Sequence, residues 1–385
     1  MHVSPKKTVL IYSEYWHSRG GGEKYLLHIA ETLLRSNYAV TIVAQTESFD
    51  KVSLERYFHV NIDEATIRFV TGNMPTLRAE AEAMSTSFDI CIYMTNYRFF
   101  PSRARQTFAV LQVPYGAITV FTLARKAMRE SIKETAKDYV RLRLFKQLRN
   151  TQAVLVYSQF VHDAIDFAHD IPSTVLEPAI DDFLVEGALK ERLILSVGRI
   201  FRGLYNDKRY DILIDAFKRL YQRLPNTTWQ YRIVGSCGHD ETSQRYLEQL
   251  RESAKGFPVY IHINASYEDV KRSYNEATLF WHAAGFGVGN QWDTPQRAEH
   301  FGMSTLEAMS ARAIPLVVNC GGQKEIVSDS QSGYLWNTED ELVERSIALM
   351  DNPPLLSHMQ TQARERFKGF DRERFSQKLI SILEP

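Results

Sequence analysis

The strongest chemical signal in the sequence is a pair of carboxylates eight positions apart, Glu299 and Glu307, in the stretch EHFGMSTLE. Glu299 stands just before a Phe-Gly-Met step, and Glu307 falls inside a helix expected to begin near Ser304. A carboxylate can accept hydrogen bonds from sugar hydroxyls, and bare amides at a helix start favour anionic oxygens. Two ordinary roles compete with this one. Ser304-x-x-Glu307 is also a capping box, and Glu299 could be a surface acid.

Glycines ahead of a helix supply a second signal. Gly20, Gly21 and Gly22 stand between an expected strand and a helix expected from about Glu23. Glycine allows the backbone to approach a ligand closely, and the free N–H groups of a helix start stabilise a phosphate. The triplet matches neither the spaced dinucleotide fingerprint nor the phosphate loop that ends in Gly-Lys-Ser/Thr. A flexible connecting turn is the alternative.

Two cations could add charge to such a site. Arg199 follows the expected strand 193–197, and Lys208 stands at the head of the next helix. At the carboxyl edge of a parallel sheet they could neutralise a diphosphate. The Arg would do so through paired N–H donors and the Lys as a compact single charge. A solvated loop cation is the alternative for each of them. His282 and His300, which flank the same region, are expected to be structural or hydrogen-bonding histidines.

The elements that position these residues follow from the hydrophobic pattern. Short runs that are apolar throughout alternate with amphipathic stretches, and this pattern is typical of parallel strands covered on both faces. The alternation stops near 178–191 and then begins again. We therefore predict an α/β protein with two doubly wound Rossmann-like domains that face each other across a cleft, with ligands outside the carboxyl ends of the strands. The expected parts are residues 1–185, residues 186–365, and a C-terminal helix in 366–385 that packs back on the first domain.

Composition excludes several classes of protein. The chain has 385 residues with 46 basic and 46 acidic side chains, so no net charge points to nucleic acid. No apolar run approaches the length of a membrane span, and the first residues are polar. The cysteines Cys91, Cys237 and Cys320 are isolated, which argues against a disulfide scaffold or a zinc site. A reduced, cytoplasmic protein is expected.

One segment departs from neutrality. Residues 125–149 contain nine basic and three acidic side chains, with apolar residues at helical spacing. A basic amphipathic helix can lie on an anionic membrane surface, so peripheral contact with the inner face of a membrane, or with an anionic acceptor, is one interpretation. A helix packed on its own domain with a solvated basic face is the other.

Together these motifs resemble the retaining glycosyltransferases of the GT-B fold, family 4 (glycosyltransferase group 1). The stretches that carry the resemblance follow the family's order and are Gly20–Glu23, Ser196–Arg199, Val234-Gly235, Glu299–Met309, Pro315 and Gly321–Val327. Gly20–Glu23 and Glu299–Gly302 also resemble, more weakly, the mannosyltransferases that assemble lipid-linked oligosaccharides.

The resemblance implies roles for individual residues. The catalytic set would be Glu299, Arg199 and Lys208, with Glu299 on the donor sugar and the two cations on its diphosphate. Glu307 would bind the ribose, and Ala265-Ser266 falls where members of the family bind the nucleobase. The implied donor-binding residues are Gly21, Gly22, Gly235, Ala265, Ser266, Phe301, Gly302, Met303, Ser304 and Glu307.

Two departures from the family pattern stand out. Gln112, with Tyr115 on the acceptor side, occupies a position where many members have a histidine, and a glutamine can bind a hydroxyl but cannot titrate. The loop 200–207, which separates Lys208 from Arg199, is longer than is common in the family.

The expected activity is that of a retaining hexosyltransferase, moving mannose from GDP-mannose to a hydroxyl acceptor in polysaccharide or lipid-linked glycan synthesis. No Asp-x-Asp occurs in the chain, so neither a metal nor another cofactor is expected. A sugar-phosphate synthase-type transferase with a UDP-sugar donor is one alternative. A non-catalytic scaffold that binds nucleotide-sugar or glycan is the other.

Overall fold

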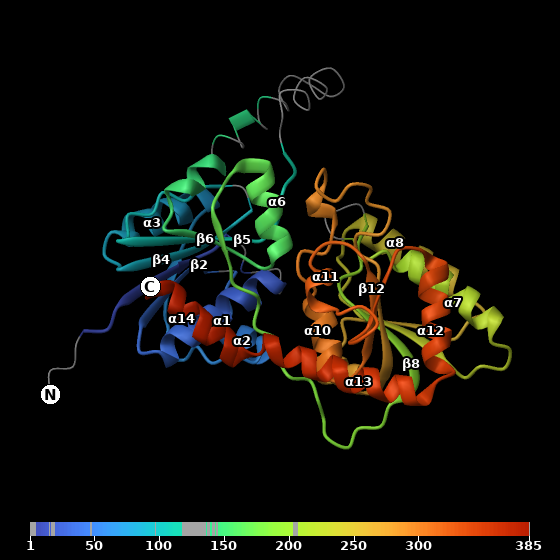
Figure 1. Cartoon of the computed structure of the whole chain (residues 1–385). Coiled ribbons are helices and arrows are strands. Elements are labelled where there is room, and N and C mark those ends of the chain that lie inside the picture. The colour runs from blue at the N-terminus through green and yellow to red at the C-terminus, as the bar shows by residue number, and fades with distance from the viewer. Residues whose placement is uncertain are drawn as a thin grey trace. The chain divides into compact units, whose positions relative to one another are not determined.

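The computed structural model describes residues 5–14, 16, 20–46, 48–96, 98–117, 136, 139–140, 143, 145–202 and 207–384. It divides into two compact units, each with its own parallel sheet (Figure 1). Unit 1 comprises Met1–Ala179 together with Arg372–Pro385, and unit 2 comprises Ile180–Asp371. The two βα series seen in the sequence thus form two α/β units.

The chain crosses between the units after residue 179 and again after residue 371, where the sequence analysis places the crossings after 185 and 365. The first crossing comes earlier because the segment after it bonds to unit 2. The N–H of Ile180 donates to the Phe370 carbonyl at 3.0 Å, and that of Phe183 donates to the Ser310 hydroxyl at 3.0 Å.

Unit 1 contains a sheet whose described strands all run parallel, in the order β3-β2-β1-β4-β5-β6-β7. Every residue of β4 is buried, as expected where helices cover both faces. The strands are β1 (Thr8–Tyr12), β2 (Ala39–Gln45), β3 (Thr66–Val70), β4 (Ile90–Thr95), β5 (Gln106–Leu111), β6 (Ala153–Val156) and β7 (Ser173–Val175).

Several helices of unit 1 begin where a side chain accepts a free N–H group of the first turn. Asp50, Asn73 and Ser158 each accept from the N–H three residues further on. The helices are α1 (Gly21–Arg35), α2 (Lys51–Phe58), α3 (Met74–Ser85), η1 (Gln147–Asn150), α6 (Gln159–His169) and α14 (Arg372–Leu383).

Unit 2 repeats the plan with the parallel strand order β10-β9-β8-β11-β12-β13. Its strands are β8 (Glu191–Val197), β9 (Gln230–Gly235), β10 (Val259–Ile263), β11 (Ala277–His282), β12 (Ile314–Val318) and β13 (Tyr334–Trp336). Its helices are α7 (Tyr210–Arg223), α8 (Glu241–Ala254), α9 (Tyr267–Glu276), η2 (Pro295–Arg297), α10 (Met303–Ser310), α11 (Gln323–Ile326), α12 (Glu339–Met350), α13 (Pro353–Phe367) and η3 (Lys368–Phe370).

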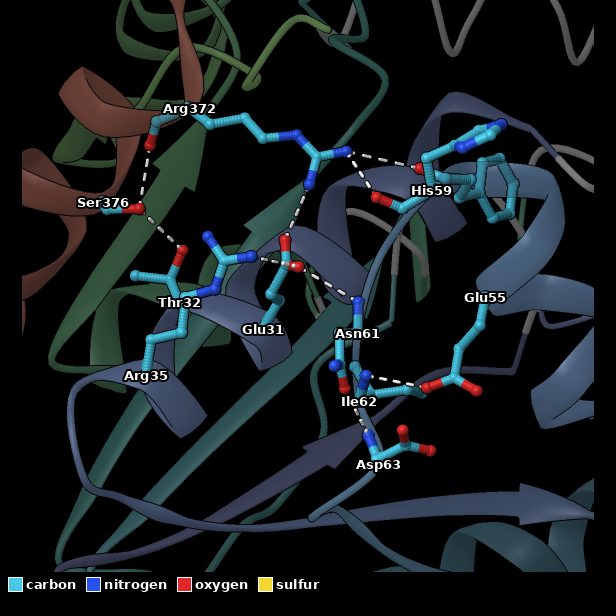
Figure 2. Close-up of polar contacts among 11 residues, drawn as sticks. Glu31, Thr32, Arg35, Glu55, His59, Asn61, Ile62, Asp63, Arg372 and Ser376 are labelled. Carbon is cyan, nitrogen blue, oxygen red and sulfur yellow. Dashed lines mark hydrogen bonds and ion pairs between the residues drawn. The ribbon is translucent and has the colours of Figure 1, made fainter.

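The C-terminal helix α14 belongs to unit 1 and lies along α1, and Figure 2 shows the contacts at its start. Arg372 donates to the Glu31 carboxylate at 2.8 Å and to the His59 carbonyl at 2.7 Å. The other Glu31 oxygen accepts from Arg35 at 2.8 Å and from the Asn61 N–H at 3.0 Å. Because Glu31 is only 4% exposed, this one buried carboxylate joins α1, α14 and the connection between α2 and β3.

Among the described residues, no helix is both long enough and apolar enough to cross a bilayer. The basic segment 125–149 falls mostly outside the described residues, so its contact with an anionic surface stays a prediction.

The substitution Glu31→Ala should destabilise unit 1. It leaves Arg372 and the Asn61 N–H without their buried acceptor, and we expect a loss of about 2–4 kcal/mol in the free energy of unfolding. Urea unfolding followed by circular dichroism measures the change. As the control, Lys7→Ala breaks the exposed Lys7–Glu384 pair and should cost less than about 1 kcal/mol. Equal losses in the two variants would contradict the role assigned to Glu31.

Candidate functional site

The strand order of unit 2 marks where a ligand is expected. From β8 the chain adds β9 and β10 on one side, and then crosses to place β11 on the other side of β8. In open α/β sheets, ligands bind outside the carboxyl ends of the strands at such a switch point. Gly198 follows β8 and His282 ends β11, so both residues lie at the switch point.

Three polar side chains meet there. Lys208, just before α7, places its Nζ 2.5 Å from Oε2 of Glu299, and His282 places its Nε2 3.1 Å from the same oxygen. Glu299 is 7% and His282 3% exposed, and the Lys208 side chain is 14% exposed. The structure thus brings together Glu299 and Lys208, which are 91 positions apart, and adds His282, to which the sequence analysis assigns only a structural or hydrogen-bonding role.

The electrostatics of this cluster fix its charge states. Burial raises the pKa of Glu299, but the Lys208 charge and the hydrogen bond from His282 outweigh burial, so the pKa lies well below its ordinary value. Burial and the Lys208 charge lower the pKa of His282, and burial lowers the pKa of His300 to about 4. At neutral pH the cluster therefore holds a carboxylate, an ammonium group and uncharged imidazoles.

Two glycines let the backbone pass close to Lys208. A Cβ added to Gly198 would lie 3.1 Å from Cε of Lys208, and one added to Gly235 would lie 1.9 Å from the Gly198 carbonyl oxygen. The N–H of Gly198 donates to the Val234 carbonyl at 3.0 Å. Gly235, predicted as a donor-binding residue, therefore has a structural task that the sequence analysis did not foresee, since it leaves room for Gly198.

Helix α10 begins beside the cluster, and its start corrects the capping-box alternative. Gly302, at φ +116°, is the N-cap residue, and no side chain caps the helix. The first hydrogen bond within the helix runs from the Thr305 N–H to the Gly302 carbonyl, so the amides of Met303 and Ser304 precede it. Glu307 lies a turn further along and accepts from the Tyr274 hydroxyl at 2.9 Å.

Other predicted residues of unit 2 use their side chains elsewhere. Arg199 is exposed and stacks on Phe201 at 5.3 Å, and no contact within the described part of the chain joins it to Glu299 or Lys208. The Ser266 hydroxyl caps α9 by accepting from the Asp269 N–H. Ala265 packs against the hydrophobic core, and the buried ring of Phe301 contacts that of Phe370 at 5.9 Å.

The remaining predicted residues lie in unit 1. Gly21 is the first residue of α1, and the N–H of Gly20 donates to the Glu23 carboxylate at 2.5 Å. A Cβ added to Gly22 would lie 3.0 Å from Oε1 of Gln112, so the structure brings Gly22 and Gln112 together near the end of β5.

Tyr115, predicted on the acceptor side, is only 7% exposed. Its carbonyl oxygen lies 3.0 Å from Nε2 of His169. The structure thus gives Tyr115 a place in the packing of unit 1.

Within the described residues, no group of three or more His, Cys, Asp or Glu side chains is arranged to hold a metal ion.

Residues 182–366 match the family model for glycosyl transferases group 1. A curated relative, GDP-Man:Man(3)GlcNAc(2)-PP-Dol alpha-1,2-mannosyltransferase of Xenopus laevis, is 27% identical over 209 residues, which are 51% of this chain and 39% of the relative. The match thus spans about two fifths of the relative's length.

Solved structures resemble the whole chain. Anabaena Alr3699/HepE in complex with UDP-glucose has a TM-score of 0.69 at 17% identity and covers 98% of this chain and 99% of that one. The sucrose-phosphate synthase of Thermosynechococcus elongatus has a TM-score of 0.69 at 15% identity and covers 98% of both chains. The predicted fold, GT-B with two parallel-sheet α/β domains, is confirmed.

The stability of unit 2 in acid should depend on Glu299. Because the folded-state pKa of Glu299 is lowered, the stabilisation is complete above pH about 4.5, the ordinary value, and is lost as the pH falls below it. Glu299→Gln should therefore lower the unfolding free energy at pH 7 by about 3 kcal/mol or more, and flatten its fall from pH 5 to pH 3. Glu252→Gln, which removes a pair with both partners exposed, should leave the pH profile unchanged.

The close approach at Gly235 gives a further prediction. Gly235→Ala should destabilise unit 2 by about 1–3 kcal/mol or more, because the new methyl group collides with the Gly198 backbone. Gly289→Ala adds a methyl group where nothing lies within 4 Å and should change stability by less than about 0.5 kcal/mol. Thermal unfolding of the two variants distinguishes a packing requirement from general intolerance of alanine.

Proposed function

Because residues 182–366 match the family model for glycosyl transferases group 1, we propose that the chain transfers a hexose from a nucleoside diphosphate sugar to a hydroxyl acceptor. The observation that carries the proposal is the ionised Glu299, held by Lys208 and His282 at the switch point of unit 2. Beside it lies the start of α10, with the amides of Met303 and Ser304.

In the proposed reaction Glu299 accepts hydrogen bonds from the donor sugar. An ammonium group has three N–H donors, so Lys208 keeps two after pairing with Glu299. With Arg199 it stabilises the negative charge that grows on the leaving diphosphate, an effect worth about 3–4 kcal/mol for a well-placed donor. Glu307, fixed by Tyr274, holds the ribose.

The bond from the sugar C1 to the diphosphate oxygen breaks while a bond from the acceptor oxygen to C1 forms. We propose that the acceptor attacks on the face that the diphosphate leaves, so that configuration is retained and the acceptor's proton passes to the leaving phosphate. This route requires no protein base. It also requires no metal, since Lys208 and Arg199 supply the positive charge.

We propose GDP-mannose as the donor and a lipid-linked glycan as the acceptor. The support is the similarity to the Xenopus laevis protein, whose name specifies a GDP-mannose donor and a dolichol-diphosphate-linked acceptor. A UDP-sugar is the competing donor, since Anabaena Alr3699/HepE shares the fold and was crystallised with UDP-glucose.

A thermal-shift comparison of GDP, UDP, ADP and TDP, each with and without EDTA, tests the donor and the metal. Nucleotide at a hundred times its dissociation constant adds about 2.7 kcal/mol, enough to raise the midpoint by about 2 °C or more. We expect the largest shift with GDP and no effect of EDTA. A selective shift with UDP would replace the proposed donor, and a shift abolished by EDTA would contradict metal independence.

Turnover then separates an enzyme from a scaffold. Glu299→Ala should lower sugar transfer from GDP-mannose by about 10²-fold or more while GDP still binds through Glu307, which is held by the Tyr274 hydroxyl. Glu252→Ala, on the exposed face of α8, serves as the control and should retain full transfer. Nucleotide binding without transfer to any acceptor by the unsubstituted protein would favour a scaffold.

A further inference from the structure

Gln323 contacts the cluster through His282. It is the first residue of α11 and is wholly buried. Its Nε2 lies 3.2 Å from Nδ1 of His282, on the side of the imidazole away from Glu299. Its Oε1 is buried and makes no hydrogen bond to any residue that the structure describes. Within the described residues, His282 is thus the hydrogen-bond partner of the Gln323 side chain.

The contacts determine where the proton of His282 lies. Its Nε2 is 3.1 Å from Oε2 of Glu299, so a hydrogen must stand between the two atoms. The adjacent Lys208 ammonium keeps Glu299 ionised, and the hydrogen is therefore on Nε2. An uncharged imidazole has a single N–H group, so Nδ1 is an acceptor and takes a hydrogen from the Gln323 amide.

The other tautomer would rearrange the cluster. Nζ of Lys208 lies 3.3 Å from Nε2 of His282. If the hydrogen moved to Nδ1, Nε2 would become an acceptor and would compete with Glu299 for the Lys208 ammonium. Glu299 would also lose the hydrogen bond from His282. The charged groups that face His282 are Lys208 and Glu299. Glu299 favours a hydrogen on Nε2 and Lys208 favours an acceptor there, so the hydrogen bond from Gln323 to Nδ1 stabilises the first arrangement against the second.

We propose that Gln323 is a positioning residue that selects the Nε2–H tautomer of His282, and so keeps His282 and Lys208 both donating to Glu299. The proposal rests on the proposed function for its consequence in sugar transfer, but its claim about the tautomer stands on the geometry alone. Within the described residues the Gln323 side chain has no hydrogen bond to Glu299, and we infer that it acts through His282.

Packing alone does not explain a glutamine at this position. A buried amide oxygen without a partner costs stability, and an apolar side chain of similar volume would avoid that cost. The amide is also crowded, because a Cβ on Gly302 would lie 2.9 Å from Oε1 and 3.0 Å from Nε2 of Gln323. A glycine is thus needed at the start of α10 to leave room for the Gln323 amide, and the hydrogen bond that this amide makes is the one to His282.

The tautomer is measured directly by ¹⁵N NMR of the full chain labelled at histidine, with the His282 resonances identified by their loss in His282→Gln. We expect the protein to show a protonated Nε2 and an unprotonated Nδ1. In Gln323→Met, which keeps the side-chain volume but removes the donor, the Nδ1–H form should appear. In Gln323→Glu both nitrogens should be protonated near neutral pH, because a carboxylate beside Nδ1 stabilises the imidazolium.

The matched control is Asn275→Asp, another buried amide of unit 2, whose hydrogen bonds go to the backbone at Phe183, Lys271 and Val185. It should lower the melting temperature without changing the His282 signals. An unchanged tautomer in a folded Gln323→Met protein would overturn the proposal, and so would an equal change in Asn275→Asp.

Kinetics test the consequence. If GDP-mannose is turned over, Gln323→Met should lower kcat/KM by roughly tenfold or more, because in the Nδ1–H form the charged Glu299 loses its hydrogen bond from His282. In Gln323→Glu, kcat/KM should acquire a dependence on pH near the raised pKa of His282. Unchanged kinetics with a changed tautomer would overturn the positioning role. If the unsubstituted protein transfers no sugar, the proposed function fails, and the NMR result still decides the claim about the tautomer.

Discussion

An ionised carboxylate can be buried only where donors replace the water that it loses. Glu299 meets this condition through Lys208 at 2.5 Å and His282 at 3.1 Å. The three side chains come from separate segments, so the backbone around them must hold each one in place. The Gly321-Gly322 step does part of this, because the Gly322 N–H donates to the Glu299 carbonyl at 2.8 Å and a Cβ on Gly321 would lie 2.3 Å from that oxygen. The position of the Glu299 backbone, and with it the ion pair, therefore depends on these two glycines.

The strand pattern of the sequence predicts most of the fold, because burial on both faces of a sheet leaves a local signature. Every residue of β4 and of β11 is buried, and both runs are recognisable in the sequence. The partners of Glu299 leave no such signature, since Lys208 lies 91 positions away, with β9, β10 and β11 between the two residues in the chain. A weak signal for His282 did exist. It is a polar residue that ends an otherwise largely apolar run, at the edge where ligands bind.

Sequence motifs place a residue at an edge of the sheet, but they do not say what its side chain contacts. Ser266 stands after β10 as predicted, yet its hydroxyl is used to cap α9, and Arg199 follows β8 but stacks on Phe201. The capping box at Ser304 fails for a related reason. Gly302 adopts a left-handed conformation and is the N-cap residue, two positions before Ser304, and the pattern Ser-x-x-Glu carries no information about the residues ahead of it.

Buried polar clusters of this kind are poor devices for stability, since apolar side chains of similar volume often stabilise a fold as well or better. Unit 2 nevertheless places a buried ion pair, an uncharged imidazole and an amide whose oxygen has no partner among the described residues at the point where its strand order reverses. What such a cluster offers is preorganisation. Because Lys208 and Glu299 are fixed and desolvated before any ligand arrives, a sugar diphosphate would meet donors and acceptors already aligned, and the protein would not have to rearrange as charge develops.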